Sequence, residues 1–216
     1  GGNMNRRAPE LPETFVLSDL EAAVAAGRES MEDVAYGLFQ DQTLPTGEEP
    51  LDFRGCRFVR CDFTQMGDRR VSFVDCVLER CEMTGAAFQK SACQRVVFSG
   101  CRMPGAQFAE GSLMHTAFEG CLMNYFSLAR EKVQQVDMRD CVMKESAFLE
   151  VGWRDWRLTD CVLEMSEWQR VPMKGLDLSA CAFTALRVEP SALRGLKVTG
   201  VQAMALSRLL GLEIVE

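Results

Sequence analysis

Cysteine is the residue type in this sequence whose spacing most clearly suggests chemistry. Seven of the ten cysteines recur at intervals of twenty residues, at Cys61, Cys81, Cys101, Cys121, Cys141, Cys161 and Cys181. A row of thiols could bind a soft metal or form disulfides. Each of the seven also occupies a small-residue position in a regular apolar pattern, where free cysteine behaves as a compact hydrophobic group. We therefore predict reduced, buried thiols, with no metal and no cofactor.

The single histidine, His115, is the other candidate for chemistry. It has no nucleophile or metal ligand in register with it, and we expect a solvated surface side chain. The sequence also lacks a glycine-rich phosphate loop, a nucleophile elbow and a paired Cys-X-X-Cys motif. These features together predict a protein that is not an enzyme.

A five-residue period in the apolar residues indicates which elements carry the cysteines. Every fifth residue from Phe53 to Val198 is apolar except Asp68, which makes twenty-nine apolar residues in thirty. A smaller residue lies two positions before each of them, so both side chains point to the same side of an extended segment. The next pair follows after three residues, and the chain must therefore bend at every repeat.

The twenty-residue spacing of the cysteines indicates that four repeats close one coil. Four short sides, with the same residue types stacked coil on coil, describe an all-β solenoid of quadrilateral cross-section over residues 51–200. Hydrogen bonds between coils would satisfy the backbone, and the inward pairs would form a continuous apolar core.

Several repeats resemble a known family. The segments at residues 51–55, 61–65 and 176–180 place Asp before Phe or Leu, which is similar to the Ala-Asp/Asn-Leu-X-X consensus of pentapeptide-repeat proteins. The resemblance implies a right-handed β-helix of pentapeptide repeats. It also implies partners, because some members protect type II topoisomerases from quinolones or toxins by imitating DNA, and many dimerise through their C-terminal ends.

The two ends of the chain differ from the repeats. Residues 1–50 are predicted to form an N-terminal helical extension and linker, with one helix opening at Ser18 and closing at Gly27, and a second over residues 30–39. Residues 201–216 are predicted to form a C-terminal capping or dimerisation helix over 201–210, followed by a strand from Leu212. Such segments would cover the open strand edges of the solenoid.

The charge distribution argues against a nucleic-acid partner. The chain carries a net charge of −7, yet residues 51–200 hold twenty basic and nineteen acidic side chains. A long basic face for direct nucleic-acid binding is therefore not expected. No apolar run is long enough to span a membrane, and the first residues do not resemble a secretory signal. We expect a cytoplasmic protein with no membrane contact.

An outward row on the side that carries the cysteines is the strongest candidate for an interaction surface. The residues before the central position on this side are, in order, Asp62, Glu82, Arg102, Leu122, Val142, Val162 and Ala182. The last four are apolar, and Tyr125 and Met165 widen the patch from nearby corners. Contiguous apolar patches usually mark contacts. A terminal segment folded back over the row would be the alternative explanation.

The C-terminal helix provides a second apolar surface, made of Val201, Met204, Ala205 and Leu209. We predict a non-enzymatic protein-interaction module that presents a rigid β-helical surface to a protein partner, including its own copy in a homodimer through the C-terminal half. The alternative, implied by the family resemblance, is a DNA-mimicking protector of type II topoisomerase (gyrase) against quinolones or toxins. A metal or thiol-redox protein that uses the cysteine row is a third possibility.

Overall fold

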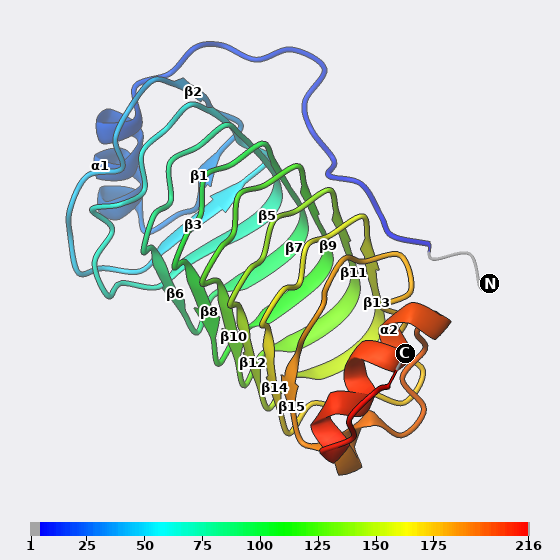
Figure 1. Ribbon diagram of the computed structural model, residues 1–216. Helices are drawn as coiled ribbons and strands as arrows, with labels where there is room; N and C mark the ends of the chain where they lie inside the picture. The colour runs from blue at the N-terminus through cyan, green and yellow to red at the C-terminus, as the bar shows by residue number, and fades with distance from the viewer. Residues whose placement is uncertain (1–4, 216) are drawn as a thin grey trace.

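The structure is a computed structural model that describes residues 5–215, and most of the chain winds into a solenoid of parallel strands (Figure 1). Within the described residues, one sheet has nine strands and a second has six. The first contains β1 (Val34–Ala35), β2 (Leu38–Gln40), β3 (Leu51–Arg54), β4 (Arg57–Val59), β5 (Val71–Glu79), β7 (Ala92–Ser99), β9 (Ser112–Glu119), β11 (Lys132–Arg139) and β13 (Gly152–Thr159). The second contains β6 (Ala87–Gln89), β8 (Gln107–Ala109), β10 (Ser127–Ala129), β12 (Ala147–Leu149), β14 (Glu167–Gln169) and β15 (Arg187–Val188). The predicted quadrilateral β-helix is confirmed.

Successive coils pair with the predicted offset. Leu113 pairs with Val133, and Val133 pairs with Trp153, which is a step of twenty residues per coil. The first coil is one residue shorter, because Val34 pairs with Phe53. Parallel strand pairing therefore begins at β1, ahead of the expected boundary at residue 51, and an isolated parallel bridge also joins Leu17 to Leu38.

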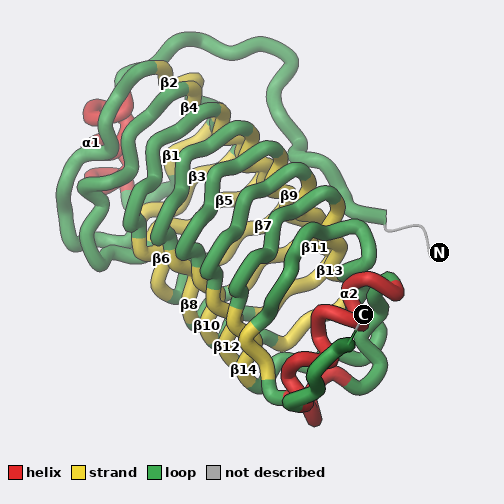
Figure 2. The backbone as a smooth tube through the Cα atoms, in the orientation of Figure 1, coloured by secondary structure: helices red, strands yellow, loops and turns green. Residues whose placement is uncertain are grey.

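The longest strands bend at a corner in their middle. Each of β5, β7, β9, β11 and β13 covers two sides of a coil, and its corner residue has a left-handed φ between 48° and 54°. These corner residues are Asp75, Arg95, His115, Gln135 and Asp155. Such a φ costs conformational energy, which the hydrogen bonds to the coils above and below offset. Figure 2 shows the strands of the two sheets and the loops that join them.

The core is the continuous apolar interior of the coils. Central residues stack on their counterparts: the rings of Phe98 and Phe118 lie 4.7 Å apart at 4°, and those of Phe88 and Phe108 lie 4.5 Å apart at 10°. All ten cysteines are buried and free. Since stacked side chains bury one another, the repeat produces a core that no single coil could form.

Helix α1 (Leu20–Ser30) covers the first end of the stack with Leu20 and Val24, which are buried. Its N-cap is Asp19, whose carboxylate accepts a hydrogen bond from the Ala22 amide at 2.7 Å. The helix predicted over residues 30–39 is wrong, because β1 and β2 occupy this segment. Pairing with β3 and β4 outweighed the local helical signal.

The C-terminal end is closed by η1 (Pro190–Leu193), α2 (Gly200–Leu206) and η2 (Ser207–Leu210). Thr199 and Gln202 form a capping box at the start of α2. The strand predicted from Leu212 is wrong, since residues 212–215 lie outside any strand and their apolar side chains are exposed. Among the described helices, none is long and apolar enough to cross a membrane.

The N-terminal segment, residues 5–17, runs along the outside of the solenoid toward its far end (Figure 1). The Arg7 amide donates a hydrogen bond to Nδ1 of His115 at 3.0 Å, and the Glu10 amide donates to Asp75 at 2.9 Å. The expectation of a solvated His115 is therefore wrong: its ring is half-buried and bonded to a segment more than one hundred residues away.

Candidate interaction surface

The side of the solenoid that carries the seven-cysteine row also carries the predicted outward row. Isolated parallel bridges join Asp62 to Glu82 and each later pair along this side, as far as Val162 and Ala182. The outward residues therefore stack coil on coil in the expected register. Its four apolar members, Leu122, Val142, Val162 and Ala182, are called the apolar stripe below.

Local alternation turns the apolar stripe outward. Cys121 and Met123 have 0% exposure, so Leu122 between them must point away from the core. Leu122 is 51% exposed, while Val142 and Val162 are half-buried against their neighbours. Apolar side chains in such positions gain free energy when a partner removes them from water.

Tyr125 and Met165 lie at the corner that follows the apolar stripe, with φ of 60° and 57°. They are 63% and 36% exposed, and Glu145 occupies the same corner in the coil between them. The pKa of Tyr125 is raised by its hydrogen bond with the Glu145 carboxylate. The phenol therefore remains protonated, as an apolar ring with a polar edge.

Within residues 5–215, neither terminal segment is bonded over the apolar stripe. The hydrogen bonds of the N-terminal segment are made to His115 and Asp75, at a corner between two other sides. Helix α2 is held at the end of the stack by the Gln202 amide, which donates to the carbonyl oxygens of Leu178 at 3.0 Å and Cys181 at 2.8 Å. The stripe is thus open to a partner.

A hollow of about 530 Å³ connects the apolar stripe with the start of α2. Val162, Ala182 and Val201 contribute to its lining, and Lys144 and Glu164 lie at its polar edge. Since Val201 is 78% exposed, the apolar surface continues from the solenoid onto the helix.

The four residues predicted on the C-terminal helix do not share one exposed face. Val201 and Met204 are exposed, Ala205 is half-buried, and Leu209 packs against the core. The helix tightens into η2, so the α-helical period used for the prediction ends early. Exposed apolar residues that the period missed follow the helix: Leu210, Leu212, Ile214 and Val215.

Acidic side chains border the apolar stripe. Asp140 and Asp160 stack at the corner before it and are exposed. Glu164 lies beyond it, and its carboxylate accepts hydrogen bonds from the amides of Thr184 at 2.8 Å and Ala185 at 3.0 Å. Burial raises the pKa of Glu164, but these hydrogen bonds outweigh it and lower the pKa overall. Glu164 is therefore charged at neutral pH.

The charged residues of the first coils on the same side are bonded within the solenoid. Asp62 accepts a hydrogen bond from the Thr64 amide at 2.7 Å, and Glu82 pairs with Arg102 at 3.6 Å. This half of the side is polar and internally paired, in contrast to the apolar stripe.

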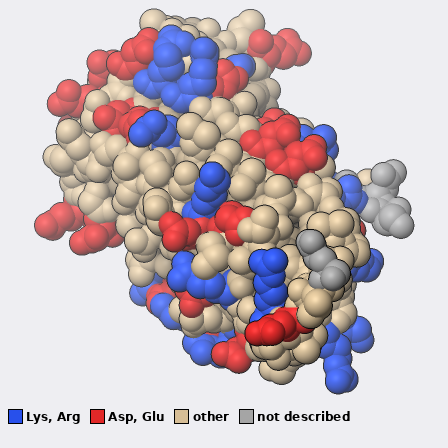
Figure 3. Space-filling view, in the orientation of Figure 1, with Lys and Arg blue, Asp and Glu red and all other residues tan. Residues whose placement is uncertain are grey.

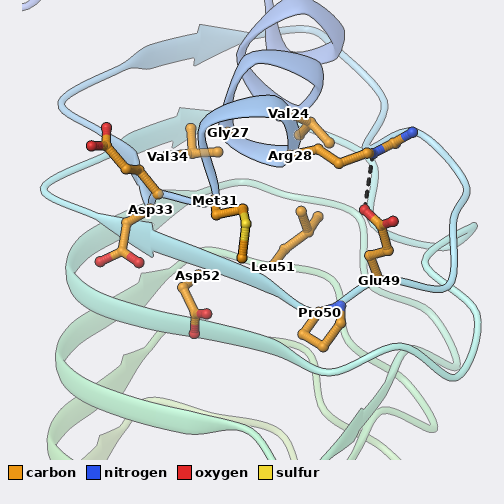
Figure 4. A pocket seen from close by; sticks show the side chains of 11 residues that line it. Val24, Gly27, Arg28, Met31, Asp33, Val34, Glu49, Pro50, Leu51 and Asp52 are labelled. Carbon is orange, nitrogen blue, oxygen red and sulfur yellow. Dashed lines mark ion pairs between the residues drawn. The ribbon is translucent and has the colours of Figure 1, made fainter.

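A second hollow, of about 520 Å³, lies at the opposite end of the solenoid between α1 and the first coil (Figure 4). Arg28 pairs with Glu49 across it at 3.0 Å. Asp33 and Asp52 at its edge pair with arginines of neighbouring coils. Four of its charged lining residues, Arg28, Glu49, Asp33 and Asp52, are thus already paired within the protein.

The cysteine row has the character of core rather than of a reactive site. Each thiol of the row donates to a carbonyl oxygen of the preceding coil, as Cys121 does to Phe98 at 3.4 Å. Burial raises the pKa of Cys93, the cysteine at a central position, and the nearby Glu131 adds to this effect. No group of three metal-binding side chains occurs in the described part of the chain.

Comparison with known proteins agrees with this geometry. Residues 91–168 match the family model described as pentapeptide repeat region. The matched residues contain the strands from β7 to β13 and most of β14, so this part of the solenoid is similar to a pentapeptide repeat region. Among curated proteins, no significant match was found.

Solved structures similar to the pentapeptide solenoid include QnrB1, a plasmid-mediated fluoroquinolone resistance protein. A trypsin-treated form shares 14% identity, with 83% of this chain and 99% of that chain covered and a TM-score of 0.32. Full-length QnrB1 shares 18% identity over 82% of this chain and 89% of that chain, with a TM-score of 0.30. Similarity this distant carries no inference about the function of the present chain.

Proposed function

We propose that this protein is a non-enzymatic interaction module whose pentapeptide solenoid presents the apolar stripe to a protein partner. The observation that carries the proposal is the outward stacking of exposed Leu122 with half-buried Val142 and Val162 on one side of the solenoid. Aliphatic side chains can bind but cannot transfer protons or attack a substrate. We therefore assign these side chains to a surface that binds another protein.

The proposal is tested by substitution on the exposed side of the solenoid. In Leu122→Lys with Val142→Lys, two charges replace the centre of the apolar stripe without entering the core. Glu82→Lys, in the polar half of the same row, is the matched control. Quantitative cross-linking in cells should recover partners with the unmodified protein and the control but not with the double variant. Equal recovery with all three proteins would refute the proposal.

We further propose that the protein associates with its own copy through α2 and the residues after it. Val201, Met204 and Leu210 are exposed on this end, and a symmetric dimer is the commonest way to bury such a surface. Val201→Lys with Met204→Lys should yield a monomer in light scattering, whereas Leu122→Lys should remain dimeric. An unmodified chain that is monomeric at micromolar concentration would refute self-association.

Protection of a type II topoisomerase by imitation of DNA is the second candidate. It needs a strongly negative flank, but one corner column alternates opposite charges, as in Glu110 with Arg130 and Glu150 with Arg170. Figure 3 shows both signs of charge dispersed over the face in view. A gyrase supercoiling assay with a quinolone, at increasing concentrations of this protein, tests the candidate. Protection of gyrase activity in this assay would make topoisomerase protection the leading candidate function.

A further inference from the structure

We propose that the partner segment bound by the apolar stripe is an amphipathic α-helix with an apolar ridge flanked by lysine or arginine. This inference rests on the proposed function and names the chemistry of the partner. Three properties of the surface carry it: the spacing of the stripe, the charge beside it and the hollow at its end.

The spacing of the stripe matches a helix better than a strand. Leu122, Val142 and Val162 are paired through successive parallel bridges, so they follow one another at about 4.8 Å along the solenoid axis. Side chains three and four residues apart on a helix are about 5–6 Å apart. On an extended strand the same-face spacing is about 6.7 Å, and the mismatch grows with every coil. A helix that lies along the axis therefore keeps its ridge in register with the stripe.

The acidic border sets the charge of the helix. Several other corners pair unlike charges in adjacent coils, as in Asp41 with Arg60 and Asp75 with Arg95. Asp140 and Asp160 stack with like charge, and within the described residues neither has an ion pair or a side-chain hydrogen bond.

Adjacent like charges are unfavourable in a stacked sheet, and a cation placed beside both relieves the repulsion. The opposite edge is also mostly acidic, with Glu145 and Glu164 around a single Lys144. Basic residues on both flanks of the helix would therefore be complementary to the two edges.

The hollow beside Val162, Ala182 and Val201 provides a binding site for one end of the partner helix. Its volume of about 530 Å³ can receive a large apolar side chain, which fixes the register of the helix. Neither helix of this chain meets the charge requirement. Helix α2 carries no charged residue, and α1 carries two acidic residues, Glu21 and Glu29, against a single basic residue, Arg28. The partner helix therefore comes from another protein.

The test uses two synthetic helical peptides with the same fluorescent label and the same leucine ridge. One has lysine on both flanks and the other has glutamate. Fluorescence anisotropy with the full chain should show at least about tenfold tighter binding of the lysine peptide at low salt. The preference should shrink as salt is added, because exposed charges are screened.

Variants of the full chain assign the contact. Leu122→Lys should abolish binding of the lysine peptide, and Asp140→Asn with Asp160→Asn should weaken it several-fold. Glu13→Gln with Glu29→Gln removes the same charge from exposed sites outside the solenoid, and binding should be unchanged. Circular dichroism confirms that each variant is folded.

Two results would overturn the inference alone, and a third would also overturn the proposed function. If both charge variants weaken binding equally, attraction is non-specific. If Leu122→Lys weakens both peptides alike and Asp140→Asn with Asp160→Asn has no effect, the stripe binds proteins but not by this chemistry, and the proposed function stands. If Leu122→Lys alters neither peptide and no cellular partner is lost, the proposed function itself fails.

Discussion

Glu131 places a carboxylic acid inside the pentapeptide solenoid, at an inward position that is 1% exposed. One oxygen accepts a hydrogen bond from the Gly111 amide at 2.6 Å, and the other has no partner among the described residues. Burial raises the pKa of Glu131 to about 7, although the bond from Gly111 lowers it. The neutral acid is therefore the form that the folded state favours.

This pKa predicts that stability falls as pH rises from about 4.5 to about 7. Over that window the folded protein keeps a proton that the unfolded chain has lost, which lowers the free energy of unfolding by about 1.4 kcal/mol per pH unit. Glu131→Gln retains an acceptor for Gly111 and has no charge, so its stability should depend less on pH. Urea unfolding at about pH 5 and about pH 8 measures this. An identical pH dependence in both proteins would contradict the assignment.

The thiols lead to a prediction about reactivity. The thiolate is the reactive form, and burial makes a thiol inaccessible to reagents and also raises its pKa, as it does for Cys93. Few of the ten cysteines should therefore react with a thiol reagent in the native protein, and all should react in denaturant. Rapid native labelling of most of them would show that the row is not core, and intact mass after purification would reveal any bound metal or disulfide.

At the scale of elements, the attachment of the N-terminal segment to the solenoid depends on the protonation state of one histidine, His115. Nδ1 of His115 accepts a hydrogen bond from Arg7, which requires a nitrogen without a proton. Burial lowers the pKa of His115, and Arg7, Arg95 and Arg6 lower it further by charge repulsion. Asp75, whose carboxylate accepts a hydrogen bond from the Glu10 amide, faces the same segment.

A lowered histidine pKa stabilises the attached state above pH 6.5, and this contribution is lost as pH falls through the folded-state value. Hydrogen exchange in residues 5–17 should therefore quicken on acidification, before exchange in the coils does. His115→Asn retains an acceptor and tolerates the left-handed backbone at this corner, so its segment should exchange at a rate that varies less over the same range. Wild-type exchange protection that is constant down to about pH 5 would contradict the role of His115.

At the scale of the whole molecule, the twenty-residue register decides which sequence changes the fold tolerates. One residue inserted between Phe118 and Glu119 shifts every later inward side chain toward a corner or the outside. Twenty residues inserted there add a coil in register, as the pairing of β9 with β11 requires. We expect the single insertion to unfold the C-terminal half and the long one to leave a cooperative thermal transition. Equal melting behaviour of the two would contradict the register.

The sequence alone determined the solenoid and the direction of nearly every side chain within it. Whether Leu122 points outward depends only on Cys121 and Met123 beside it, and the bend at each corner follows from the alternating spacing of two and three residues. The side-chain alternation and the corner spacing recur in every coil, so all thirty repeats predict the same solenoid. The start of the stack at Val34 was not predictable in this way, because residues 30–39 have a helical local signal that pairing with the next coil overrides.

Only the tertiary structure decided how the ends meet the solenoid. The attachment of Arg7 to His115, the docking of Gln202 on two carbonyl oxygens and the packing of Leu209 against the core each join residues far apart in the chain. No local pattern encodes these contacts. They depend on which surfaces the coils leave unpaired, and this also decides that the apolar stripe is open while the corner at His115 is covered.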